Sequence, residues 1–148
     1  MEKTKYTIAI HEAAHFLADI NEGRKPKYAT IVPEGESLGH VRSGRTMAFI
    51  EHYGLSEKAT ISHIFAIMAG PMAENRHTGE YSNDHDAIKD SVSDWDTIVD
   101  FLISWGNSQR LYDRAFNKAT RWVDKNMPEI QRVAAELYQN DTVDMRCW

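Results

Sequence analysis

The sequence predicts a mainly helical domain of the α+β class, with a small β-sheet in its N-terminal third. Apolar residues recur at helical spacing over most of residues 55–148, whereas residues 27–33 form a β-branched and aromatic segment between two prolines. The length of 148 residues fits one domain. We therefore expect a single domain, 1–148, in which residues 1–54 contribute the first helix and the sheet, and residues 55–148 contribute the helical part.

The chain is expected to begin with a helix. Thr4 or Thr7 can cap it, because a threonine hydroxyl accepts a hydrogen bond from an unpaired amide of the first turn. A partial apolar stripe continues to about Asn21, and Glu22 followed by Gly23 ends the helix.

Short strands follow this helix. Residues 27–33 predict the first strand, residues 34–36 a turn, and residues 38–41 a second strand that pairs with the first. Residues 47–50 predict a third strand beyond a polar loop.

The rest of the chain is expected to be helical. Ser56 can begin a helix that Pro71 must kink, because proline lacks the backbone donor and clashes one turn back. Ser82 or Asn83 can cap the next helix, which continues to Gly106.

Three aspartates of the predicted helix that ends at Gly106, Asp94, Asp96 and Asp100, are interpreted as a solvated face.

Ser108 begins a further helix to about Met127, and Pro128 is expected to start the last one, over residues 129–138.

Charge and cysteine content limit the function classes. There are 17 Lys and Arg against 22 Asp and Glu, which gives a net charge of -5 and argues against nucleic acid as a partner. The one cysteine, Cys147, allows neither an intrachain disulfide nor a thiolate metal cluster and fits a cytoplasmic protein. No apolar segment approaches the ~20 residues of a membrane span. Any transition metal must therefore bind to nitrogen and oxygen ligands, which the seven histidines and the carboxylates can supply.

An H-E-x-x-H sequence lies inside the first predicted helix. His11 and His15 are four residues apart, so both imidazoles lie on one helix face and can reach one zinc ion. Glu12 is placed beside the metal and can accept a proton from the attacking water. Ala13 and Ala14 are small enough for another element to pack closely.

A catalytic zinc site needs a third protein ligand. The candidates lie after the predicted helix that carries Pro71, and they are Glu74, His77, Asp84, His85 and Asp86. Asp84 can be a ligand or a helix cap, and Glu74 can be the third ligand or an acceptor for a ligand imidazole N–H. The residues alone leave this choice open.

Four short segments give the motif a context. They are residues 10–15 (IHEAAH), residues 30–35 (TIVPEG) with 38–40 (LGH), residues 69–74 (AGPMAE) and residues 78–84 (TGEYSND). In this order they resemble the protease domain of the FtsH-type ATP-dependent zinc metalloproteases. The resemblance extends over nearly the whole chain. One departure from the family pattern is Ala14, which stands where that family usually has glycine.

The resemblance implies a role for several residues. His11 and His15 bind zinc, Glu12 is the catalytic base, Asp84 is the third ligand, and Glu74 has a supporting role. Residues Leu38, Gly39, His40 and Val41 correspond to an edge strand that can bind an extended polypeptide substrate by strand addition.

The sequence thus predicts a zinc metalloendopeptidase that cleaves unfolded or flexible polypeptides without an ATPase of its own. We expect it to form a homo-oligomer or to act with a separate ATPase partner. The alternative is a non-catalytic protein-binding module that keeps a zinc-peptidase fold. Retention of Glu12 argues against that alternative, because a purely structural zinc site needs no base at this position.

Overall fold

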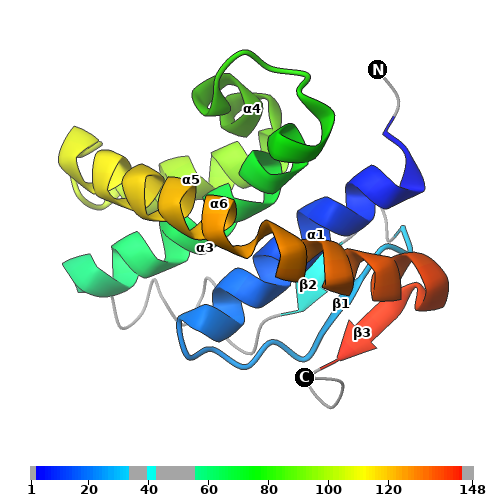
Figure 1. The fold of residues 1–148 in the computed structure, drawn as a ribbon. Coiled ribbons are helices and arrows are strands. Elements are labelled where there is room, and N and C mark those ends of the chain that lie inside the picture. The colour runs from blue at the N-terminus through cyan, green and yellow to red at the C-terminus, as the bar shows by residue number, and fades with distance from the viewer. Residues whose placement is uncertain (1–2, 34–39, 43–55, 145–148) are drawn as a thin grey trace.

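The computed structural model describes residues 3–33, 40–42 and 56–144. These ranges hold a mainly helical fold with a small antiparallel sheet, as the sequence predicts (Figure 1). The described helices are α1 Lys5–Asn21, α3 Glu57–Thr78, α4 Asp84–Asp90, α5 Val92–Ile103 and α6 Gln109–Asn140. The described strands are β1 Tyr28–Thr30, β2 His40–Arg42 and β3 Thr142–Asp144.

Helix α1 is enclosed by the rest of the fold. It contacts α3, α6, β1 and β2, and Figure 1 shows α6 crossing in front of it. The Thr4 side chain caps α1 by accepting a hydrogen bond from the Thr7 amide, which confirms the predicted start of the helix. Because elements surround α1 on several sides, even polar residues in its middle are buried.

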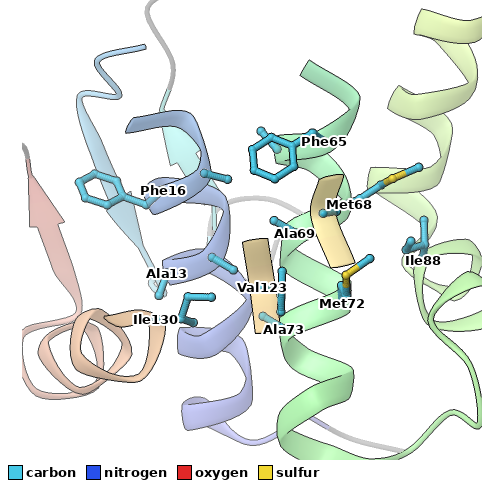
Figure 2. Packing of buried hydrophobic residues seen from close by; sticks show 14 of the residues in the cluster. Ala13, Phe16, Phe65, Met68, Ala69, Met72, Ala73, Ile88, Val123 and Ile130 are labelled. Carbon is cyan, nitrogen blue, oxygen red and sulfur yellow. The ribbon is translucent and has the colours of Figure 1, made fainter. Parts of the chain in front are cut away.

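Small residues allow α1 and α3 to pack closely. Ala13 of α1 and Ala69 and Ala73 of α3 are fully buried, and Figure 2 shows them among larger apolar side chains. Val123 and Ile130 of α6 belong to the same core and are also fully buried. The core therefore fixes α3 against the helix that carries the H-E-x-x-H sequence.

The sheet has the order β2-β1-β3 in the described residues, and β1 pairs antiparallel with both neighbours. The predicted pairing of the first two strands is confirmed, with Ala29 opposite Val41. Strand β3 was not predicted; in it, Val143 lies opposite Ala29 and is almost fully buried. The predicted strand at residues 47–50, together with Leu38 and Gly39, lies outside the described residues.

Two helix boundaries were predicted wrongly. The expected helix end before Pro128 does not occur, because α6 continues through this exposed proline with buried Val123 and Ile130 on either side of it. The expected single helix up to Gly106 is divided at Ser91 into α4 and α5. The second difference affects the candidate site directly.

Pro71 likewise lies inside a helix, because α3 continues through it from Glu57 to Thr78. None of the helices in the described part of the chain is both long and apolar enough to cross a bilayer.

Candidate metal centre

Three side chains of α1 form a candidate metal-binding group. One ring nitrogen each of His11 and His15 and a carboxylate oxygen of Glu12 lie within 4.8 Å of one another. The two imidazole rings have centroids 4.7 Å apart, as expected for residues one helical turn apart. His11 and Glu12 are 9% and 7% exposed, so the group is shielded from bulk water.

Helix α3 fixes the orientation of the His15 ring. The Nδ1 atom lies 2.9 Å from the backbone carbonyl oxygen of Ala66. A carbonyl oxygen only accepts hydrogen bonds, so the Nδ1–H group must be the donor. In the neutral ring the lone pair is then on Nε2, which is the atom free to bind a metal.

The ring of His11 is fixed in the same way by a carboxylate. Its Nδ1 atom lies 2.9 Å from Glu74 Oε1, which also accepts a hydrogen bond of 3.0 Å from Lys3 Nζ. Burial raises the pKa of Glu74, but His11 and Lys3 together bring it below its usual value. Glu74 is therefore an anionic acceptor, and the lone pair of neutral His11 is also on Nε2.

The Nε2 atoms of both histidines face one further carboxylate. Asp94 Oδ2 lies 2.8 Å from His11 Nε2 and 3.3 Å from His15 Nε2. The Asp94 side chain is 20% exposed, so the interpretation of this residue as part of a solvated helix face is wrong.

The break between α4 and α5 places Asp94 at this position. It lies in the first turn of α5, where the helix dipole favours a negative charge, and Ser91 Oγ donates to its Oδ2 atom over 2.9 Å. The pair Ser91-x-x-Asp94 matches the capping pattern that often begins a helix, so the sequence did contain a signal for this break.

Asp84, which the resemblance favours as third ligand, makes different contacts. It begins α4, and its Oδ1 atom accepts hydrogen bonds from Arg76 Nη1 at 2.5 Å and Asn75 Nδ2 at 3.1 Å. The other aspartate of this segment, Asp86, is exposed and accepts a hydrogen bond from Asn83. Within the described residues, the carboxylate that hydrogen-bonds to both imidazoles is that of Asp94.

Electrostatics at the site favour positive charge. Burial lowers the pKa of His11, but the hydrogen bond and charge of Asp94 outweigh burial and raise this pKa to about 10. Burial likewise lowers the pKa of His15, and Asp94 raises it above the ordinary value. Burial raises the pKa of Asp94, but the charges of His15 and His11 bring it well below its usual range.

These side chains fit a zinc ion by the chemistry of their donor atoms. When both imidazoles are neutral, their two Nε2 lone pairs and the ionised Asp94 carboxylate are acceptors that converge, so either protons or a metal cation must lie between them. Imidazole nitrogen and carboxylate oxygen are ligands that zinc prefers, and Nδ1–H groups held by a carbonyl or carboxylate are typical of ligating histidines.

Two cavities in the described part of the chain lie away from His11 and His15. One of about 1080 Å³ lies between the end of α1 and the start of α3, and its wall includes Arg24, Lys58 and Lys118. Another of about 320 Å³ lies between α4, α5 and α6 and includes Trp95, the residue after Asp94. Buried, convergent ligand atoms therefore identify the candidate metal centre better than cavity size does.

Strand β2 contains two of the four residues predicted to bind substrate, His40 and Val41. In the part of the chain that the structure describes, β2 pairs with β1 and contacts α1. The described part of the predicted strand is therefore next to the helix that carries His11 and His15.

A buried H-E-x-x-H group on a helix is the hallmark of one class of zinc peptidases. Comparison with known proteins agrees with this class at the level of distant similarity. No protein-family model matches the chain. The ATP-dependent zinc metalloprotease FtsH of Slackia heliotrinireducens is 29% identical over 119 residues, which cover 79% of this chain. The matched part spans 15% of the length of that relative.

Proposed function

We propose that the protein is a zinc-dependent endopeptidase in which His11, His15 and Asp94 hold the metal and Glu12 is the general base. The convergence of two fixed imidazoles on one partly buried carboxylate is the observation that carries the proposal. The distant similarity to an FtsH zinc metalloprotease supports the choice of zinc and of peptide hydrolysis.

A bound zinc ion would polarise the peptide carbonyl and lower the pKa of a bound water. Glu12 has its carboxylate within 4.8 Å of the ligand nitrogens, so it can accept a proton from that water as the oxygen attacks the carbonyl carbon. The same carboxyl group then gives the proton to the amide nitrogen when the C–N bond breaks. Burial of Glu12 keeps bulk water from competing for this proton.

We further propose that the substrate is an extended, unfolded or flexible polypeptide that pairs with the strand Leu38, Gly39, His40 and Val41. Strand addition uses backbone hydrogen bonds and demands little of the substrate side chains. The proximity of β2 to α1 supports this placement.

The test compares wild type with Glu12→Gln on a short peptide library and on casein, with zinc content measured in both. We expect the variant to keep its zinc and to lose at least about 100-fold of its activity, because general base catalysis contributes roughly 10²–10⁴-fold. Glu136→Gln, which changes an exposed glutamate of α6, is the matched control and should leave the rate unchanged.

Two outcomes would contradict the proposal in different ways. Equal cleavage by wild type and Glu12→Gln would refute Glu12 as the base. Stoichiometric zinc in a wild type that cleaves none of the substrates would favour the non-catalytic binding module.

A further inference from the structure

Gly70 of α3 lies directly against the two histidines. A Cβ atom at this position would be 2.4 Å from His15 Nε2, 2.5 Å from His15 Cε1 and 2.9 Å from His11 Cδ2. Real Cβ atoms essentially never approach non-bonded heavy atoms within 3.0 Å. Other described glycines such as Gly79 have a positive φ, but Gly70 lies inside a helix, so the need for glycine here comes from space alone.

We propose that Gly70 is a positioning residue that sets the metal affinity of this centre. Because Gly70 has no side chain, α3 can pack in contact with both imidazoles and hold their rings with Nε2 toward Asp94. The inference rests on the proposed metal site and adds a residue that touches neither metal nor substrate.

The neighbours of Gly70 on α3 explain why the rings cannot move aside. Ala66, Gly70 and Glu74 are four residues apart in turn and therefore lie along one face of the helix. Ala66 holds His15 through its carbonyl oxygen, and Glu74 holds His11 through its carboxylate.

A methyl group at Gly70 must therefore displace His15 or α3. If the His15 ring turns away, it loses its bond to Ala66 O or its approach to Asp94. If α3 moves away from α1, the hydrogen bonds that Ala66 and Glu74 of α3 make to the two rings lengthen. Either response takes Nε2 out of the geometry that a metal requires.

The first experiment measures zinc affinity of Gly70→Ala by competition with a chromophoric chelator, and the absorption spectrum of the cobalt-substituted protein. We expect zinc affinity to fall roughly 10–100-fold, as it does when the group that hydrogen-bonds to a metal-ligating side chain is lost. The visible cobalt bands should shift or weaken. The spectrum reports ligand geometry, which a merely less stable protein with an intact site would not change.

Gly79→Ala is the matched control. It makes the same chemical change at the end of the same helix, where φ is +65° and nothing lies within 4 Å of the added carbon. This variant should lower the melting temperature through backbone strain and leave zinc affinity and the cobalt spectrum unchanged.

A second experiment keeps the proposal testable if Gly70→Ala is poorly folded. In metal-free protein, Gly70→Ala should lower the melting temperature less in a His15→Ala background than in wild type, because the closest clash is then absent. Equal losses in both backgrounds, or unchanged zinc affinity and cobalt bands, would overturn the proposal. None of these measurements uses a peptide substrate, so a failure of the peptidase proposal is distinguishable from a failure of this one.

Discussion

At the scale of single residues, the proposed metal site depends on which aspartate completes it. Asp94 and Asp84 both lie in the first turn of a helix, and both accept more than one hydrogen bond. They differ in their partners. Asp94 faces the Nε2 atoms of both histidines, whereas Asp84 is held by Arg76 and Asn75.

We therefore predict opposite results for two alanine variants. Asp94→Ala should lower zinc affinity by at least about 100-fold, because it removes a ligand and not only an outer partner. Asp84→Ala should change zinc affinity by less than about threefold and reduce stability by about 1 kcal/mol, the ordinary value of a hydrogen-bonded group. Chelator competition and urea unfolding of both variants measure these quantities.

The reverse pattern, with zinc lost from Asp84→Ala and retained in Asp94→Ala, would restore the assignment that the sequence resemblance favours. It would also mean that α4 and α5 rearrange when the metal binds. Zinc content of the two purified variants is enough to distinguish these cases.

At the scale of elements, local signals predict α1 well and the α4–α5 region poorly. Helix α1 has a threonine cap, a continuous helical pattern and no breaker, so its start, its end and its histidine face all follow from the sequence. In the α4–α5 region the apolar residues continue across Ser91, and that periodicity outweighed the short capping pattern. Asp94, which we propose as the third ligand, was not among the predicted candidates for this reason, because a helix drawn through Ser91 leaves Asp94 on a solvated face.

Tertiary packing explains the other differences. Pro128 would end a helix in isolation, but buried residues on both sides keep α6 continuous through it. Strand β3 is three residues long and pairs with β1 across more than a hundred residues of sequence. No local pattern can predict such a pairing.

Strand β3 should nevertheless contribute to stability. Val143 is 3% exposed and lies opposite Ala29, so Val143→Ala leaves a cavity and should cost about 1–3 kcal/mol in the free energy of unfolding. Val32→Ala is the matched control, since Val32 is 50% exposed and should lose less than about 0.5 kcal/mol. Urea denaturation measures both, and equal small losses would show that β3 contributes little to the fold.

At the scale of the whole molecule, the proposed metal ligands come from distant parts of the chain. His11 and His15 lie on α1, Asp94 lies on α5, and α3 supplies the acceptors behind both rings. A metal at this point would connect α5 to the α1–α3 core. Ligand binding to the folded state alone stabilises it, by about 2.7 kcal/mol at a free concentration 100 times the dissociation constant.

Zinc removal should therefore lower thermal stability and loosen α5 in particular. For a domain of this size, 2.7 kcal/mol corresponds to a fall in melting temperature of roughly 5–10 °C. Amide hydrogen exchange should become faster in α5, whereas α1 and α3 keep most of their protection, because their apolar packing does not depend on the metal. A His11→Ala/His15→Ala variant serves as the control and should show no zinc-dependent shift. A zinc-dependent shift of the same size in that variant would mean that the stabilising metal binds elsewhere, and no shift in wild type would argue against a metal link between α1 and α5.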